Sequence, residues 1–473
     1  MLDYFSVFVL AILTLSYVVG ELVHFMPGVL SQQMSQDLHY GDQKCFSTNS
    51  QNATVCLKIQ NESQCELENP TCEFIYSGQG IEYQVLAGPA FSIPFTCGSL
   101  IWGAIAGQGP RPRLVGICTL LFSVCSGLFG VSRAYWQLVV LRVLCAFGES
   151  GLRPLASSIL PDLVKPERLG LANGCFSLGI MFGYGLSFAM GNYFSLVTSL
   201  GWRACFALSF IAGSIVGIAL LFIKDFGNRE MRINETTALI TQDDSKTTSK
   251  PLNCLSKFAE FKQTKMVLML IAASLRQTGG ESLSNNTQLY YDQYYPEVNP
   301  GLWLTTCSIV GGTSGLLLGG LLSDFAKRRM GIRARFWVLT ASQLLSTPFA
   351  WAMLLLPPPW SYVALLLYYC LGKFDPMHSS TSKNNFRDIN VLSFSAETWL
   401  AILFAILIEL TKPRNRAMTS AIFVFAMNNL AGLLSLLVDP LSKILSFRLA
   451  LMIMWPSFII LGGLTFGIST LVK

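Results

Sequence analysis

The chain has 473 residues, of which 52% are apolar and only 13% are charged, whereas soluble globular proteins carry about 25% charged residues. This deficit excludes an ordinary soluble enzyme. The net charge of +6 lies in short loops rather than in a basic, aromatic patch, which argues against nucleic-acid binding. Because the apolar residues form runs of about 20, long enough to cross a bilayer, we expect an all-α membrane protein.

Twelve apolar runs, bounded by charged or turn residues, follow one another along the chain. They are predicted at 5–29, 82–106, 114–132, 136–160, 169–194, 202–223, 266–284, 302–323, 336–356, 360–372 continuing at 394–411, 417–438 and 447–471. An even number of transmembrane helices places both termini on the same side of the membrane.

Basic residues mark alternate loops, and loops rich in Lys and Arg stay on the cytosolic side of a membrane. The marked loops contain Arg111 and Arg113, Lys165 and Arg168, the segment 224–265, Lys327 to Arg335, and Lys412 to Arg416. Both termini are therefore predicted to be cytosolic. The polar segment 224–265 is predicted to be a linker between an N-terminal six-helix bundle, 1–223, and a C-terminal one, 266–473.

The largest loop on the opposite side, 31–80, is rich in cysteine. Four cysteines in one polar loop predict two disulfide bonds, made in an oxidising compartment, and leave three pairings open. The cysteines are Cys45, Cys56, Cys65 and Cys72, and two glycosylation sequons begin at Asn52 and Asn61. A further triplet, Asn285-Asn286-Thr287, is predicted to fall in another outer loop.

The loop after the eighth span contains Gly320, Asp324, Arg328 and Arg329 with the spacing Gly-x3-Asp-x3-Arg-Arg. This pattern resembles the cytosolic loop signature of the major facilitator superfamily. An acid near a helix end with basic neighbours can form a breakable latch, so these residues are predicted to be a cytosolic gate motif. The matching loop of the first half has Gly107 where the acid is expected, so any latch there must be weak or differently built.

A second pair of repeated segments places an acid, a helix end and a Lys-Pro pair in both halves. Glu149 is followed by Asp162 and Lys165-Pro166, and Glu397 is followed by Glu409 and Lys412-Pro413. The separation from Gly103 to Glu149 is 46 residues, but that from Gly320 to Glu397 is 77 residues. The excess is visible as the polar stretch 373–394, which we interpret as an insertion within the tenth helix; an ordinary long loop is the alternative.

The first half resembles the spinster family of facilitators. The resemblance rests on Arg142-x5-Gly148-Glu149-Ser150, Pro154, Asp162-Leu163 with Arg168, the glycines Gly179, Gly183 and Gly185, and Gly201-Trp202-Arg203. It implies the major facilitator fold, with twelve transmembrane helices in two six-helix bundles. It also implies transport of an amphiphilic organic solute, such as a lysolipid or sphingoid compound, with protons as the candidate coupling ion.

Charged groups inside membrane spans are costly and usually face a cavity or a partner. The predicted substrate or coupling residues are Glu21 in the first span, Arg142, Glu149 and Arg153 in the fourth, Arg276 and Gln277 in the seventh, and Glu397. Spacings of seven and four residues place Arg142, Glu149 and Arg153 near one helical face, which suits an anionic head group beside a proton-binding carboxylate. A structural Arg–Glu pair is an equal alternative for Arg142.

Two further polar sites have both a functional and a structural interpretation. His24, three residues from Glu21, could relay protons, although a histidine satisfied within the core is commoner. Asn428 and Asn429 could bond a ligand or a neighbouring helix.

The sequence therefore predicts a secondary transporter that works by alternating access, and not an enzyme. No spacing of His and Cys predicts a metal site, and no phosphate-binding loop or other cofactor motif is found. The expected partners are the lipid bilayer, a small-molecule or lipid substrate, and protons, but not nucleic acid. The membrane is predicted to be the plasma or an endolysosomal membrane. A small organic anion carrier and a non-transporting membrane sensor are the alternatives.

Overall fold

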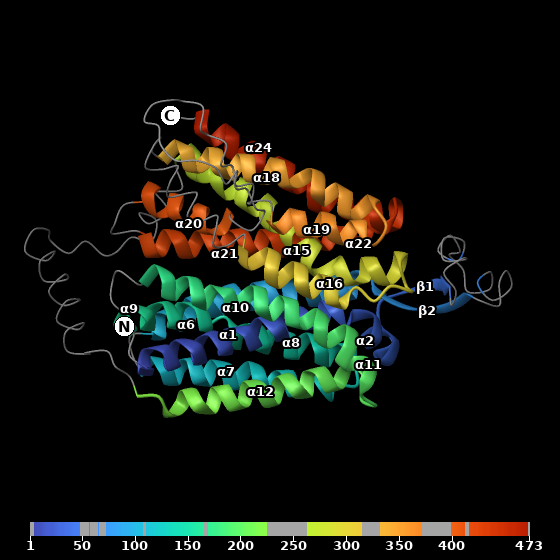
Figure 1. Cartoon of the computed structure of the whole chain (residues 1–473), viewed down its shortest axis with the longest axis horizontal. Coiled ribbons are helices and arrows are strands. Elements are labelled where there is room, and N and C mark those ends of the chain that lie inside the picture. The colour runs from blue at the N-terminus through green and yellow to red at the C-terminus, as the bar shows by residue number, and fades with distance from the viewer. Residues whose placement is uncertain are drawn as a thin grey trace, which may run out of the picture.

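The computed structural model describes residues 4–47, 56, 65, 72–106, 110–164, 169–224, 263–314, 332–370, 399–411 and 416–471. Its helices run along one common direction in two groups, the first half of the chain on one side and the second half on the other (Figure 1). The predicted fold class, a helical membrane protein of two bundles, is confirmed.

The N-terminal half is built on long helices joined by short connections. Its helices are α1 (Tyr4–Val29), α2 (Ser31–Leu38), α5 (Ile81–Ala87), α6 (Pro89–Ile105), α7 (Arg111–Gly130), α8 (Tyr135–Glu149), α9 (Leu152–Leu163), α10 (Leu169–Ala189), which continues through a π-helical turn Met190–Phe194 into α11 (Ser195–Val197), and α12 (Trp202–Phe222). Its strands are β1 (Asp42–Ser47) and β2 (Cys72–Gln79).

The C-terminal half repeats this plan. Its helices are α15 (Thr264–Tyr294), α16 (Gly301–Thr306) with a π-helical turn Cys307–Gly312, α18 (Ile332–Leu355), α19 (Trp360–Cys370), α20 (Trp399–Leu410), α21 (Arg416–Leu434) with a 3-10 turn Ser435–Leu437, α22 (Val438–Ile444), α23 (Phe447–Met452) with a π-helical turn Ile453–Ser457, and α24 (Phe458–Leu471). Each of the twelve predicted spans contains at least one of these helices.

Eight helices among the described residues are long and apolar enough to cross a membrane. The other predicted spans correspond to shorter pieces or, for α15, to a helix of 31 residues with many polar side chains. The prediction of a span over 266–284 was too short, because α15 continues to Tyr294. Asn285, Asn286 and Thr287 lie in this helix and are buried, so their placement in an outer loop was wrong.

The predicted loop 31–80 contains regular structure. After α2, strands β1 and β2 pair antiparallel, with Lys44 opposite Ile75 and Ser47 opposite Cys72. This hairpin projects from one end of the molecule, which we call the hairpin end; the first residues of α1 and the last residues of α24 lie at the opposite, terminal end (Figure 1).

Small residues on α10 allow α1 to pack closely against it. A Cβ atom added at Gly183 would lie 2.6 Å from the Cβ of Glu21, and one added at Gly179 would lie 3.0 Å from the Tyr17 ring. Small residues at helix contacts let the backbones approach. These glycines therefore fix the position of the α1 face that carries Tyr17 and Glu21.

The helices α19 and α20 pack against different parts of α18. Phe336 and Leu339, near the start of α18, share a core with Ile402 of α20, whereas Met353 near its end shares a core with Leu365 of α19. The two helices accordingly occupy opposite parts of the C-terminal half in Figure 1. This is the arrangement expected of two parts of one span, although the stretch 373–394 itself lies outside the described residues.

Candidate functional site

Three charged residues of α8 and α9 meet successive positions of α1. Arg142 reaches the backbone of Val23, Glu149 contacts Gly20 and His24, and Arg153 reaches Tyr17. The predicted common face of Arg142, Glu149 and Arg153 is therefore the face turned toward α1. The helix breaks between Glu149 and Leu152, yet this order is kept across the break.

His24 lies between the two acidic side chains of this region. Its Nδ1 atom is 3.6 Å from Oε2 of Glu21 and 3.5 Å from Oε1 of Glu149. These three residues, which we call the His24 cluster, bring together helices α1 and α8. Both acids are among the residues predicted from the sequence, whereas a structural role was favoured for the histidine that joins them.

Glu149 is the most deeply buried acid of the cluster. Its side chain is 2% exposed, and neither carboxylate oxygen has a hydrogen-bond partner. An ionised carboxylate without partners in an apolar interior is strongly unfavourable. The site therefore favours binding of a proton or another cation by Glu149.

Aromatic rings hold the histidine in place. The imidazole of His24 stacks on Phe25, with ring centres 4.4 Å apart, and lies 3.8 Å from the ring centre of Phe91 on α6. The guanidinium of Arg142 also lies over the Phe91 ring, 4.3 Å from the ring centre. These rings exclude water from the imidazole faces while leaving the Nδ1 edge turned toward the carboxylates.

The guanidinium of Arg142 contacts protein groups and is not accessible to a ligand. It is buried, donates from Nε to the carbonyl of Leu86 at 3.3 Å, and approaches the carbonyl of Val23 at 3.5 Å. Together with its position over Phe91, these contacts hold Arg142 against α1, α5 and α6, and no Arg142–Glu149 ion pair is found among the described contacts.

Arg153 differs because it is exposed. Its Nε and Nη2 donate to the hydroxyl of Tyr17 at 3.2 and 2.8 Å. An exposed guanidinium keeps donors for a carboxylate or phosphate. Among the predicted arginines of the described helices, Arg153 thus has the access that head-group binding requires.

The polar residues predicted in α15 form their own contacts. Arg276 is buried, donates from Nε to Oε1 of Gln343 at 2.6 Å, and lies over the ring of Trp399. Gln277 donates to Oε1 of Glu281 at 3.2 Å. Arg276 and Gln277 therefore bond within the C-terminal half, and the partner of Gln277 is Glu281, the acid close to it in the predicted seventh span.

An ion pair lies at the terminal end of the N-terminal half. Nη1 of Arg111 is 2.6 Å from Oδ2 of Asp162 and donates to the carbonyl of Ser158 at 2.7 Å. The acid that the first loop lacks is thus supplied by the end of α9. The gate residues Gly320, Asp324, Arg328 and Arg329 lie outside the described residues, as do Glu397, Asn52 and Asn61.

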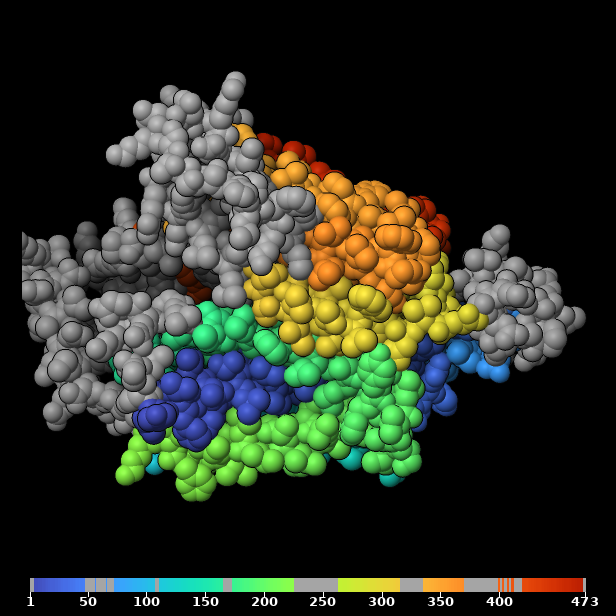
Figure 2. Space-filling view, in the orientation of Figure 1, coloured from blue at the N-terminus to red at the C-terminus, as the bar shows by residue number. Residues whose placement is uncertain are grey.

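Hydrogen bonds join the two halves toward the hairpin end. Tyr83 donates to the carbonyl of Asn285, and Gln84 donates to the side chain of Asn286 at 3.0 Å. Further bonds connect Asn192 with Gln288 at 2.9 Å, Gln79 with Gln293 at 2.5 Å, and Asn429 with Thr96 at 2.9 Å. The surfaces of α15, α16 and α10 accordingly meet in Figure 2. Asn429 therefore bonds a helix of the other half.

The hairpin adds charged contacts to these bonds between the two halves. Lys443 of α22 lies 3.1 Å from both Asp42 of β1 and Asp439 of its own helix. Lys44 donates to Gln79 at 2.5 Å and lies near Phe447 of α23. Burial of Lys44 lowers the pKa of its ammonium group to about 8, against the opposing effect of Asp42 and Asp439.

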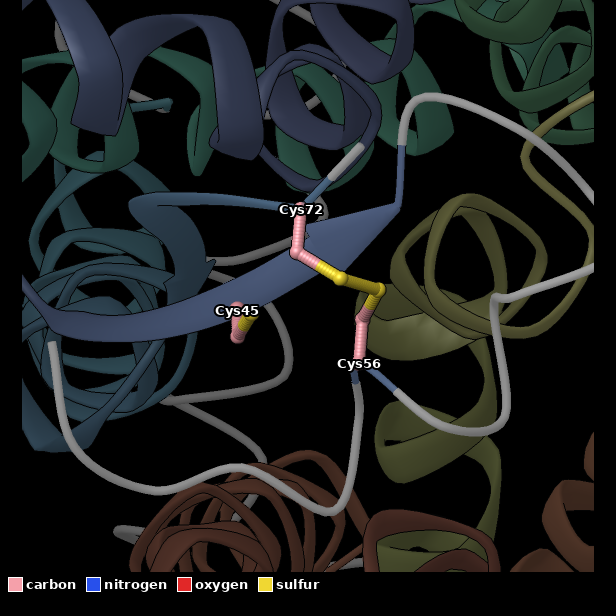
Figure 3. Close-up of side chains that lie close together, drawn as sticks. All are labelled: Cys45, Cys56 and Cys72. Atoms are coloured by element: carbon pink, nitrogen blue, oxygen red, sulfur yellow. A yellow bond between two sulfur atoms is a disulfide. The ribbon is translucent and has the colours of Figure 1, made fainter. Parts of the chain in front are cut away.

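The four cysteines of the hairpin region form two disulfide bonds in the structure. Cys45 pairs with Cys65, and Cys56 pairs with Cys72. Figure 3 shows the second bond, which ties Cys56 to the start of β2 beside Cys45. The sequence left three pairings open, and the structure contains this one.

The ligand atoms of Glu21, His24 and Glu149 lie within 4.8 Å of one another, close enough to hold a metal ion. The environment is poor for a divalent cation, because Arg142 interacts electrostatically with both His24 and Glu149. A single positive charge, such as a proton, suits the cluster better.

Comparison with known proteins agrees with this architecture. The model of the Major Facilitator Superfamily matches residues 7–387. A crystal structure of a bacterial homolog of the human lysosomal transporter spinster, in an inward-facing and unoccupied conformation, superposes with a TM-score of 0.68 over 99% of this chain and 98% of that chain, at 15% identity. The xylose transporter XylE from E. coli superposes with a TM-score of 0.63 over 98% of this chain and 95% of that chain, at 14% identity.

Curated relatives match in part. A "probable sphingolipid transporter spinster homolog 1" of Arabidopsis thaliana is 21% identical over 308 residues, which are 59% of this chain and 60% of that protein. A "multidrug resistance protein 3" of Bacillus subtilis is 27% identical over 136 residues, which are 28% of this chain and 25% of that protein. The chain thus matches between a quarter and three fifths of the length of these two relatives.

Proposed function

The chain belongs to the major facilitator superfamily, and from this premise we propose that it is a proton-coupled transporter of an amphiphilic organic solute, of the lysolipid or sphingoid kind. The observation that carries the proposal is the His24 cluster, where the buried carboxylate of Glu149 has no hydrogen-bond partner and favours a bound proton. Similarity to the probable sphingolipid transporter of Arabidopsis thaliana supports the lipid-like substrate.

Transport proceeds by alternating access, in which the two bundles rock about a central site. The bonds between Tyr83 and Asn285 and between Gln84 and Asn286 keep the hairpin end closed in this conformation. Opening that end breaks them, together with the ion pair of Asp42 and Lys443.

The hairpin end faces away from the cytosol. Disulfide bonds form in oxidising compartments, and two lie in the hairpin region. The arginine-bearing loops at the terminal end then face the cytosol, as the positive-inside rule requires. Both termini are cytosolic, Asn52 and Asn61 are available for glycosylation, and the membrane is the plasma or an endolysosomal membrane.

Substrate contact falls to Arg153, and proton binding falls to Glu149 and Glu21. Arg153 is exposed and can hold the charged head group, while Arg142 and Arg276 are occupied by Leu86 and Gln343. A small organic anion carrier would need a site with several free arginines. Because Arg142 and Arg276 already bind protein groups, that function is the weaker alternative.

The test is uptake by purified protein in proteoliposomes, with and without a pH gradient, against lysophospholipids, sphingosine and small organic anions. We expect gradient-dependent uptake of a single-chain lipid, lost on Arg153→Gln. Uptake of the small anions alone would replace the substrate assignment. Absence of any flux, with ligand binding that requires the cysteine-rich loop, would favour a sensor.

A further inference from the structure

We propose that His24 is a proton relay that moves one proton between Glu149 and Glu21 and gives the buried acid its contact with solvent. The inference deepens the proposed proton coupling and rests on it. It follows from the placement of one imidazole nitrogen between two carboxylates and from the unequal exposure of the three side chains.

The geometry makes His24 the link between two acids on different helices. Nδ1 lies 3.5 Å from Glu149 and 3.6 Å from Glu21, and no hydrogen bond between the two carboxylates is found among the described contacts. One nitrogen therefore faces both groups at nearly equal distance. A shift of a few tenths of an ångström toward either acid brings it within hydrogen-bonding distance.

The exposed fractions of the three side chains indicate which of them exchanges protons with water. The side chain of His24 is 23% exposed, whereas Glu149 is 2% and Glu21 is 9% exposed. Glu149 has no hydrogen-bonded neighbour through which a proton could arrive. The histidine is thus the member of the cluster that water reaches most readily.

The proton transfer balances within the cluster. In the tautomer with hydrogen on Nε2, the Nδ1 lone pair faces both acids. The carboxylic acid of Glu149 gives its proton to Nδ1, leaving a carboxylate and an imidazolium; the imidazolium then gives the Nδ1 proton to Glu21, and the ring is neutral again. One O–H bond breaks, one forms, and no other reactant is required.

The surrounding groups favour a ring that keeps its orientation. Phe25 and Phe91 cover the imidazole faces, so the Nδ1 edge stays turned toward the acids. The other charged or titratable groups that act on the cluster include Arg142 and Cys145 from α8, Arg153 from α9 and Tyr17 from α1. Arg142 interacts electrostatically with His24 and opposes a lasting imidazolium, which suits a relay better than a permanent ion pair.

The test follows protonation of Glu149 without a substrate. Time-resolved infrared spectroscopy after a pH jump records the carboxylic acid band of the purified protein, and the Glu149 band is identified by its loss in Glu149→Gln. In His24→Gln, which preserves polarity but accepts no proton, we expect that band to rise more slowly by an order of magnitude. The matched control is His39→Gln, because His39 is exposed and lies between α2 and β1, outside the cluster.

An unchanged rate in His24→Gln, or a wild type without a titrating Glu149 band, would overturn the relay. Since His24→Gln could disturb packing, His24→Phe, which retains a ring between Phe25 and Phe91, provides a second variant with the same expected slowing. Transport in proteoliposomes is measured separately. A normal pH-driven uptake by wild type with no slowing in either variant rejects the relay but preserves proton coupling.

Discussion

Oε1 of Glu149 on α8 lies 3.5 Å from Nδ1 of His24 on α1, and neither carboxylate oxygen of Glu149 has a hydrogen-bond partner. The pair joins two helices of the N-terminal half at a point where α1 is held closely against α10. A carboxylate placed in this way is a cost to the fold that a proton can remove.

Replacement of Glu149 by Gln should stabilise the resting protein. The amide carries no charge to desolvate, so Glu149→Gln is expected to raise the thermal unfolding temperature at neutral pH, by a free energy of about 1–3 kcal/mol. Differential scanning fluorimetry in detergent measures the shift. A protonated Glu149 is less costly to bury than an ionised one, so the stability gained by Glu149→Gln should shrink as pH falls. An unchanged or lower melting temperature of the variant at every pH would contradict the interpretation.

Gly183→Ala should disturb the site from the side of α10. The new methyl group would lie 2.6 Å from the Cβ of Glu21 and 2.7 Å from the carbonyl of Val18, so α1 must move. We expect a loss of stability of about 1–3 kcal/mol and impaired transport. Gly174→Ala, in the same helix with nothing within 4 Å, is the matched control and should be neutral or slightly stabilising. Equal effects of the two changes would exclude the close contact.

The ion pair of Asp42 and Lys443 should hold the hairpin end closed. The side chains are 28% and 52% exposed, so the pair contributes no more than about 1 kcal/mol, and its loss should shift the opening equilibrium up to about fivefold. Asp42→Lys should increase labelling of a cysteine placed at the hairpin end. Adding Lys443→Asp should restore the original labelling, and failure of this charge exchange to do so would argue against a direct pair.

The neighbouring Lys44 should make docking of the hairpin depend on pH. Its pKa is lowered to about 8 by burial, whereas an exposed lysine has a pKa near 10.4, so the undocked hairpin binds more protons between these values. Docking should therefore strengthen as pH rises from about 8 toward 10. Hydrogen exchange of β1 and β2, corrected for intrinsic rates, measures it. In Lys44→Met the trend should flatten; an identical trend in that variant would assign it elsewhere.

Local sequence patterns were sufficient to predict much of the fold. Apolar runs and loop cations located the helices because a bilayer imposes both signals on each segment separately. They failed at α15, whose polar residues Asn285 and Asn286 suggested a loop. In the structure the backbone carbonyl of Asn285 and the side chain of Asn286 accept hydrogen bonds from Tyr83 and Gln84 of the other half, and no local pattern records such a contact.

The same distinction applies to the site. Glu21 and Glu149 could be selected because charges within membrane spans are rare. The role of Arg142 and the meeting of His24 with both acids depend on how α1, α6 and α8 pack. The pairing of Asp42 with Lys443 joins residues nearly the whole chain apart, and exposed charges of this kind carry no signal of their own.

The central claim is that Glu149 binds the proton that drives transport. The most direct measurement uses proteoliposomes containing a pH-sensitive dye and labelled lysophosphatidylcholine, recording proton and lipid movement together in wild type and Glu149→Gln. The account predicts that wild type moves both and that Glu149→Gln still exchanges lipid but moves no protons and accumulates none. Proton-coupled accumulation by Glu149→Gln equal to that of wild type would contradict it.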